Sequence, residues 1–197
     1  MLTSRDKEVL TWIENYKAIS INQCSILFFS NSYEGARRRL KQLEEMQYLK
    51  SYIIKESKEK IYYWDKKISK HDLLILDFIT AMKFNEAELL EYKYQPQYLN
   101  GDIRPDAFMI FKYKDKVLFI LLEVDLHHYT SNIKMQTYEK LFKSGELQEK
   151  CFGTFPIVVI GRPTDGIRYN SSNFPVVYLD LYYNNINSLL LQNPNIL

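Results

Sequence analysis

The sequence is poor in residues that break or bend a chain, with only six prolines and six glycines among its 197 residues. Disordered and low-complexity segments are usually rich in these residues, so their scarcity argues against long segments of that kind. The longest apolar run, residues 117–124, is far too short to cross a bilayer. The first ten residues, MLTSRDKEVL, lack the apolar stretch of a signal peptide. These absences predict an ordered cytoplasmic protein that does not contact membranes.

Several motifs that would indicate a specific chemistry are also missing. The only two cysteines, Cys24 and Cys151, stand in neither a CxxC motif nor a metal-ligand spacing, so we expect two buried thiols. The sequence contains no glycine-rich phosphate loop, no nucleophile elbow and no zinc-ligand spacing. ATP use therefore has no support in the sequence.

Charge is unevenly distributed along the chain, although the net charge is only +2. Residues 1–67 carry 13 Lys and Arg against 9 Asp and Glu, which gives +4, whereas residues 68–197 carry 13 against 15, which gives −2. A basic first third suggests that this part of the chain meets a polyanion.

The first third has the pattern of three helices followed by a hairpin. Apolar residues recur at helical spacing within residues 3–18, 21–29 and 33–49, with Ser4 and Ser20 as expected N-caps of the first two helices. Two β-rich segments, SYIIK and KIYYW, follow on either side of the charged turn ESKE. This order predicts a winged helix-turn-helix over residues 1–67.

In that fold the third helix enters the major groove of DNA with its N-terminal half toward the bases. Ala36, Leu40 and Leu43 would form its inward face. The expected DNA-binding residues are Ser32, Tyr33, Glu34, Arg37, Arg38 and Lys41 of this helix, and Lys55, Lys58 and Lys60 of the wing. The alternatives are a solvated charged face, or a winged helix that binds protein.

Residues 68–197 have the pattern of an α/β domain. Ser69 can cap a helix over residues 70–84, and its apolar positions 74, 75, 78, 79 and 82 form one stripe. Strands at 88–95 and within 104–125, a helix over 131–145, and strands at 155–161 and 175–181 complete the order α-β-β-β-α-β-β. The expected fold class is therefore α+β, with a mixed sheet covered on both faces and residues 117–122 at its centre.

The stretch RPDAFMIFKYKDKVLFILLEVD, residues 104–125, holds carboxylates on adjoining strands, an arrangement with which many nucleases bind a divalent metal. An even hairpin loop, for instance Lys114-Asp115, would put Asp106 on the same face of the sheet as Glu123 and Asp125, whereas an odd loop would separate them. We expect the even loop.

Asp106 after Pro105, Glu123 on the next strand, and a following helix with Lys134 and Tyr138 resemble the PD-(D/E)xK nuclease-like fold. The whole chain resembles the plasmid replication-relaxation proteins of Gram-positive bacteria. The segments that carry this resemblance are YEGARRRLKQLEEMQYL, RPDAFMIF, LLEVD, KMQTY and VVIGR, together with His71. It implies a winged helix joined to a nuclease-like domain that serves plasmid replication, relaxation or mobilisation.

One departure from the nuclease pattern bears on activity, because Asp125 stands where the nuclease lysine is expected. If the site is active, Lys134 supplies the missing charge, and Asp106, Glu123, Asp125 and Lys134 are catalytic, with the three acids as Mg²⁺ ligands. Otherwise hydrogen bonds hold Asp106 and Glu123 in an inactive scaffold. One of His127 and His128 could join a metal site, although surface loop positions are the usual role of such a pair. Arg104 and Arg162 are expected to neutralise the acids.

The leading hypothesis is a sequence-specific DNA-binding protein of a plasmid or mobile element, whose nuclease-like domain is inactive and serves assembly. Its expected partners are double-stranded DNA, a second copy of the chain, and plasmid replication or mobilisation proteins, with no required cofactor. One alternative is a Mg²⁺-dependent endonuclease or nicking enzyme, and another is a transcriptional regulator that responds to a ligand or peptide.

Overall fold

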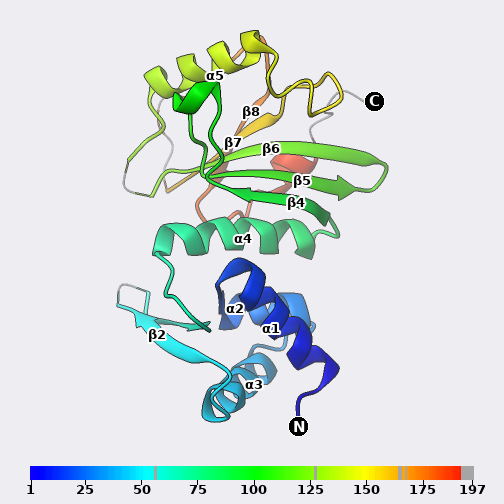
Figure 1. Ribbon diagram of the computed structural model, residues 1–197, viewed down its shortest axis with the longest axis vertical. Coiled ribbons are helices and arrows are strands. Elements are labelled where there is room, and N and C mark those ends of the chain that lie inside the picture. The colour runs from blue at the N-terminus through cyan, green and yellow to red at the C-terminus, as the bar shows by residue number, and fades with distance from the viewer. Residues whose placement is uncertain (56, 127, 164–165, 167, 192–197) are drawn as a thin grey trace. The chain divides into compact units, whose positions relative to one another are not determined.

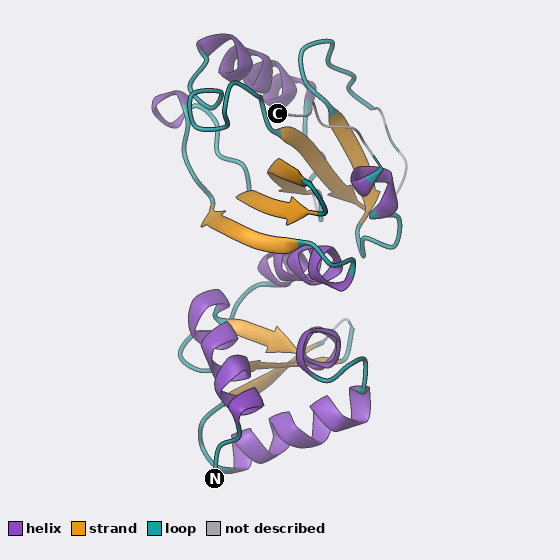
Figure 2. Cartoon of the chain, turned by 90° about the vertical axis from the view of Figure 1, so that its right-hand side faces the viewer, coloured by secondary structure: helices purple, strands orange, loops and turns teal. Residues whose placement is uncertain are grey.

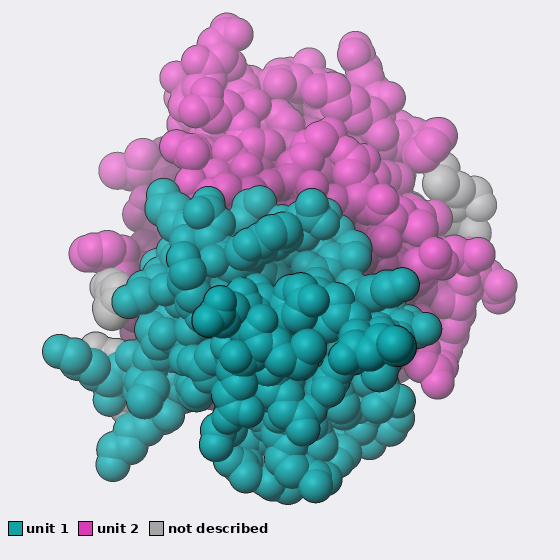
Figure 3. Space-filling model, turned by 60° about the horizontal axis from the view of Figure 1, so that its bottom comes forward, with its two compact units in different colours: residues 1–80 teal, residues 81–197 magenta. Residues whose placement is uncertain are grey.

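The computed structural model describes residues 1–197 except 56, 127, 164–165, 167 and 192–197 (Figure 1). The chain is a mixed α and β protein, and Figure 2 shows its helices and strands. It divides into two compact units, Met1–Thr80 and Ala81–Leu197, which Figure 3 distinguishes by colour. The first unit continues into the helix that follows residue 67, so the expected domain boundary at 67 stays a prediction. No helix in the described part of the chain has the length and apolar character needed to cross a bilayer.

The first unit contains the three helices and the hairpin that the sequence predicted. Its elements are α1 (Ser4–Tyr16), β1 (Ala18–Ser20), α2 (Ile21–Phe28), α3 (Tyr33–Glu45), β2 (Lys50–Ile54) and β3 (Glu59–Tyr63). The short strand β1 was not expected. It pairs antiparallel with β3, which gives a three-stranded sheet in the order β1-β3-β2. Ala36, Leu40 and Leu43 are buried, so the expected inward face of α3 is confirmed.

Local hydrogen bonds fix the ends of these helices. Thr3, and not Ser4, is the N-cap of α1, because Thr3 has an acid three residues later and forms a capping box with Asp6. The expected cap of α2 is confirmed, since Ser20 forms a capping box with Gln23. Helix α3 ends at Glu45, earlier than expected, and Gln47 beyond it has a positive φ of 65°. A left-handed residue cannot continue an α-helix, so the chain turns there toward β2.

Asp6 also ties α1 to α3. Its side chain is 1% exposed and accepts hydrogen bonds from Arg39 Nε at 2.7 Å and Arg39 Nη2 at 2.5 Å. The hydrogen bonds from Arg39 are the main cause that lowers the pKa of Asp6 to about 2, against an ordinary value of 3.8. This ion pair contributes to the stability of the first unit.

We expect Arg39→Met to destabilise the first unit by about 2 kcal/mol at pH 7, because it leaves a buried carboxylate without its charged partner. Since the pKa of Asp6 is lowered in the folded state, the stabilisation should be present above pH 3.8 and lost as the pH falls toward 2. Both tryptophans, Trp12 and Trp64, lie in this unit, so urea unfolding followed by tryptophan fluorescence measures the change.

The matched control for this prediction is Lys41→Met, which removes an exposed ion pair with Glu45 on the same helix. Exposed pairs contribute ~0–1 kcal/mol, so this variant should unfold at nearly the parent urea concentration. Equal stability of the Arg39 and Lys41 variants would contradict the role given to the buried pair.

The remaining elements also follow the predicted order. They are α4 (Lys70–Phe84), β4 (Glu88–Tyr94), β5 (Ala107–Tyr113), β6 (Lys116–Val124), α5 (Asn132–Ser144), β7 (Ile157–Arg162) and β8 (Val176–Asp180). Two short helices were not expected, the 3₁₀ helix η1 (Leu99–Gly101) and α6 (Asn187–Leu190). The expected capping by Ser69 is confirmed, because its hydroxyl accepts a hydrogen bond from the backbone N–H of Asp72 at 3.0 Å.

Strands β4 to β8 form a five-stranded mixed sheet in sequence order, with antiparallel pairing from β4 to β6 and parallel pairing from β6 to β8. The prediction that β6 lies at the centre is confirmed, and its residues 118–124 are all buried. Helix α5 connects β6 to β7 and crosses one face of the sheet (Figure 1). Its buried side chains Met135, Tyr138 and Leu141 share a core with Phe108, Phe119, Leu121, Val158 and Ile160 of the strands.

The hairpin between β5 and β6 has the even loop that the sequence predicted. Tyr113 pairs with Lys116, so the loop consists of Lys114 and Asp115. The pairing of Ala107 with Leu122 at the other end of the hairpin places the next residues outward, Asp106 and Glu123, opposite each other. Opposed residues in an antiparallel pair project from the same face.

Candidate functional site

Asp106 and Glu123 lie on the face of the sheet that α5 covers. Asp106 immediately precedes β5, and its Oδ2 accepts a hydrogen bond from the backbone N–H of Val124 at 2.8 Å. Its carboxylate is close enough to raise the pKa of both Glu123 and Tyr138. The prediction that the two acids share one face is confirmed.

Glu123 is held by two side chains from α5. It is 2% exposed, and its Oε1 accepts a hydrogen bond from the Tyr138 hydroxyl at 2.5 Å. Its Oε2 accepts one from Lys134 Nζ, also at 2.5 Å. Residues four apart on a helix share one face, and for this reason Lys134 and Tyr138 reach the same carboxyl group.

The electrostatics of Glu123 combine burial with these contacts. Burial is the main cause that raises its pKa to about 7, and the nearby Asp106 raises it further, while Lys134 and the Tyr138 hydroxyl oppose the change. Burial and Glu123 together raise the pKa of Tyr138 well above its usual value of 10, so Tyr138 remains a hydrogen-bond donor. The Lys134 ammonium is the positive charge that offsets a buried carboxylate here.

Asp125 has a separate set of partners. Its Oδ1 accepts hydrogen bonds from the backbone N–H of Thr130 at 2.8 Å and from the Thr130 hydroxyl at 2.7 Å. Its Oδ2 lies 3.7 Å from Nη2 of Arg162. Both side chains of this ion pair are at most 6% exposed, and the Arg162 guanidinium also lies 4.3 Å from the ring centroid of Tyr178.

The two arginines that were expected to neutralise the acids differ in outcome. Arg162 lies beside Asp125, as expected. Arg104 is exposed, and its Nε donates instead to the carbonyl of Gln95 at 3.3 Å. Of the two histidines considered with them, His128 is exposed and His127 lies outside the described residues.

The acids as they lie do not fit a divalent metal ion. Within the described ranges, no three carboxylate, imidazole or thiol side chains are arranged to hold one. Both oxygens of Glu123 already accept hydrogen bonds, and the ammonium of Lys134 stands 2.5 Å from Oε2, at the distance where a cation would bind. The metal-ligand role of Asp106, Glu123 and Asp125, and the catalytic role of these acids with Lys134, stay predictions.

The sequence-predicted DNA-binding residues of α3 lie mostly on its exposed face. Ser32 is the N-cap, and its hydroxyl accepts from the N–H of Gly35 at 3.3 Å. Tyr33 is 52% exposed. Three further residues on the exposed side are charged: Glu34 and Arg37, which pair with each other, and Arg38. Lys41 is exposed as well, with its ammonium 3.6 Å from Glu45.

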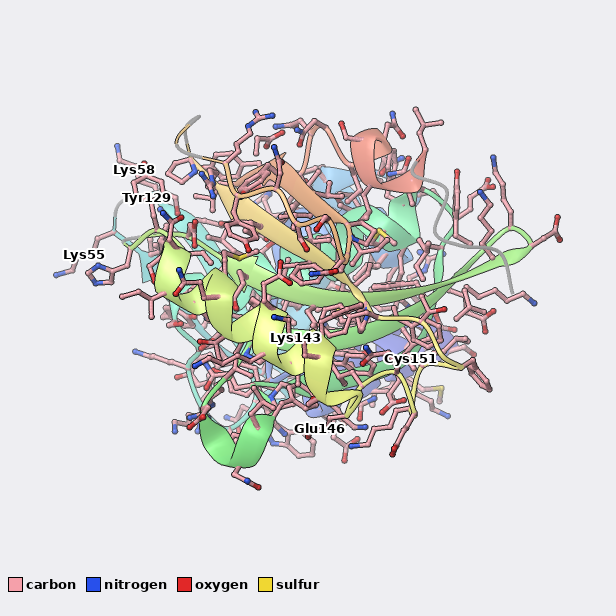
Figure 4. The ribbon with its side chains drawn as sticks, turned by 90° about the horizontal axis from the view of Figure 1, so that it is seen from above. Lys55, Lys58, Tyr129, Lys143, Glu146 and Cys151 are labelled. Carbon is pink, nitrogen blue, oxygen red and sulfur yellow. The ribbon has the colours of Figure 1, made fainter. Side chains whose placement is uncertain are left out.

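The three lysines of the β2–β3 hairpin do not share one environment. Lys55 and Lys58 are exposed, and their side chains extend outward (Figure 4). Lys60 is only partly exposed, because its ammonium donates to Glu44 of α3 at 2.7 Å and lies 4.9 Å from the ring centroid of Tyr62. Two of the three lysines are therefore presented at the turn, and the third connects the hairpin to α3.

Sequence reasoning did not anticipate several polar contacts that organise the molecule. Gln23, besides capping α2, donates to Asp77 of α4 at 2.7 Å, and burial raises the pKa of Asp77 to about 7. Glu139 of α5 accepts hydrogen bonds from Tyr169, Ser171 and Asn173. Most of these partners are more than thirty residues apart in the chain, and no local pattern indicates such pairs. Both cysteines are buried as expected, and burial raises the pKa of each thiol.

Comparison with known proteins identifies no relative of this chain. No model of a known protein family matches the chain, and no curated protein sequence matches it. Functional conclusions therefore depend on the contacts of α3 and of the buried carboxylates.

Proposed function

We propose that this chain binds duplex DNA, with its first unit acting as a winged helix-turn-helix whose α3 enters the major groove. The observation that carries this proposal is the division of α3 into two faces. Ala36, Leu40 and Leu43 are buried, whereas Arg37 and Arg38 project from the exposed side. A helix that is anchored by one apolar face and presents arginines on the other has the form of a recognition helix.

Two further features support the same proposal. The order α1-β1-α2-α3-β2-β3 is compatible with a winged helix-turn-helix, in which the β2–β3 hairpin would be the wing. Lys55 and Lys58 at the tip of this hairpin are exposed and able to contact phosphates. The excess of four positive charges in residues 1–67 agrees with a surface that meets a polyanion.

The direct test is binding of the full chain to a fluorescently labelled duplex, followed by anisotropy over a range of salt concentrations. Contacts to Z phosphates give a slope of about −0.9Z in a plot of log K against log salt. We expect a clearly negative slope that corresponds to several contacts. Absence of binding at ~50 mM salt, or a slope near zero, would reject the proposal.

For the second unit we propose a nuclease-like fold that does not catalyse cleavage and instead supports assembly of the protein, for example as a homodimer. Two of the three acids expected to react are buried, with Glu123 2% and Asp125 4% exposed. A phosphodiester would have to displace Lys134 and Tyr138 to reach Glu123. The corresponding biological setting, replication, relaxation or mobilisation of a plasmid, belongs to the same proposal.

We accordingly expect no cleavage of supercoiled plasmid by the full chain, with Mg²⁺ or with Mn²⁺. The reason is that both oxygens of Glu123 already accept hydrogen bonds from Lys134 and Tyr138, so this acid does not offer a ligand to the metal ion that such cleavage needs. The measurement is the conversion of supercoiled to nicked plasmid on a gel. Nicking that requires metal and disappears in both Glu123→Ala and Lys134→Ala would favour the endonuclease alternative.

A further inference from the structure

Arg37 and Glu34 form an ion pair on the exposed side of α3. Two hydrogen bonds give this pair a defined geometry. Arg37 Nε donates to Glu34 Oε2 at 2.8 Å, and Arg37 Nη2 donates to Glu34 Oε1 at 2.6 Å. The two residues are three apart, so the pair spans one turn of the helix. Both side chains are about half exposed, at 48% and 59%, which leaves the pair accessible from solvent.

The way in which the pair is made leaves one edge of the guanidinium available. Glu34 occupies the edge formed by Nε and Nη2. The remaining edge, formed by Nη1 and the second N–H of Nη2, carries two parallel donors, and no hydrogen bond from Nη1 to another described residue accompanies the pair. Two parallel donors match the O6 and N7 acceptors that guanine presents in the major groove.

We propose that Arg37 reads a guanine in the DNA site through this edge, and that Glu34 positions Arg37 for it. The inference rests on the proposed DNA binding through α3 and adds the base that is recognised. Arginine has several rotatable bonds, and a free arginine would lose this freedom when it binds. Because Glu34 already holds the guanidinium by two hydrogen bonds, less freedom remains to be lost on contact with the base.

Glu34 itself is assigned a positioning role and not the recognition of a base. A glutamate in the major groove accepts a hydrogen bond from the amino group of cytosine. Here, however, both carboxylate oxygens of Glu34 already accept from Arg37. Its negative charge also opposes close approach to phosphates, so its presence on a DNA-facing surface is explained by its effect on Arg37.

Selection of bound sequences from a randomised duplex library, with the full chain at moderate salt, tests the proposal. We expect one position at which guanine is strongly preferred, by roughly 5- to 150-fold over other bases. Arg37→Lys keeps the charge but loses the paired donors. It should reduce the preference at that position to about 3-fold or less, while its affinity for random-sequence duplex stays within about 3-fold of the parent.

Two further protein variants and one modified base make this test more specific. Glu34→Gln should weaken the guanine preference without abolishing it, because the neutral amide holds Arg37 less firmly. Replacing the selected guanine by 7-deazaguanine removes N7, and should weaken binding of the parent protein but not weaken binding of Arg37→Lys further. Arg5→Lys, at an exposed arginine of α1 that lies outside the proposed DNA-contacting residues, is the control and should leave the preference unchanged.

The possible outcomes distinguish a failure of the proposed DNA binding from a failure of the proposed role of Arg37. Failure of the full chain to bind any duplex would reject both the proposed function and the role of Arg37. Duplex binding without a preferred guanine, or with a preference that Arg37→Lys retains in full, would reject only the role of Arg37. A guanine preference lost in Arg37→Lys, together with a loss of sensitivity to 7-deazaguanine, would establish the contact.

Discussion

Replacing Arg37 and Arg38 together by glutamate is expected to lower the affinity of the full chain for duplex DNA by about 100-fold at 50 mM salt and about 10-fold at 200 mM salt. The variant removes two cations from the proposed DNA-facing side of α3, so about two fewer counterions are released on binding, and the gain from this release is greatest when salt is dilute. The salt slope should accordingly become shallower by about 2. Anisotropy measurements on one labelled duplex at several salt concentrations give both quantities.

This experiment needs a control that changes the net charge of the protein by the same amount at positions outside α3. The control is Lys140→Glu together with Lys150→Glu, two exposed lysines of the second unit, which changes the net charge by the same amount. This variant should keep most of the parent affinity and nearly the parent slope. Both arginines are exposed, so the α3 variant should also unfold in urea near the parent concentration, as followed by the fluorescence of Trp12 and Trp64. If the arginine variant bound DNA as well as the parent, α3 would not be the groove-facing helix.

The order of helices and strands could be predicted because each long element carries its own periodic signal. Strand β6 is buried on both faces and shows an uninterrupted apolar run, while α3 repeats its apolar residues at helical spacing. The even hairpin loop was predictable from turn preferences. Strand β1 was missed because three residues are too few to show a period, and it exists only through its pairing with β3.

The start of α1 was predicted wrongly although the sequence held the signal. Thr3 and Ser4 are both good caps by residue type, but only Thr3 is followed at the third position by an acid, Asp6, whereas Ser4 is followed by Lys7. The reciprocal hydrogen bonds of the capping box favour Thr3. Residue type alone could not decide between Thr3 and Ser4 as the N-cap. The acid three residues after Thr3 decides between them.

Some of the residues that gather around Glu123 were predictable from the sequence, but the depth at which they bury it was not. Lys134 and Tyr138 were expected to share a face of their helix, and the structure places both on Glu123. The sequence did not indicate how deeply Glu123 is buried, because burial depends on how α5 packs over the sheet. It also gave no sign that Thr130 would hold Asp125, although Arg162 was expected to lie near the acids.

Lys134→Met is expected to destabilise the second unit by about 3 kcal/mol at pH 8, because it leaves the buried carboxylate of Glu123 without its positive partner. The pKa of Glu123 is about 7 in the folded protein and 4.5 when unperturbed, so between these values the folded state holds more protons. The parent's stability should therefore fall as the pH rises from 4.5 to 7 and then become level. Without the ammonium that pKa rises further, so the stability of the variant should continue to fall above pH 7.

The second unit contains no tryptophan, so amide hydrogen exchange in β6 and α5 is the suitable measurement. Adding Glu123→Gln to Lys134→Met should restore most of the protection at pH 8, because a neutral amide still accepts from Tyr138 and needs no counter-charge. Lys140→Met, an exposed lysine on the same helix, is the control and should exchange like the parent. If Lys134→Met were as well protected as the parent at pH 8, or gained nothing from Glu123→Gln, the buried carboxylate would not depend on Lys134. The second unit would then tolerate loss of the ammonium, and Lys134 would be free to serve a substrate instead of the fold.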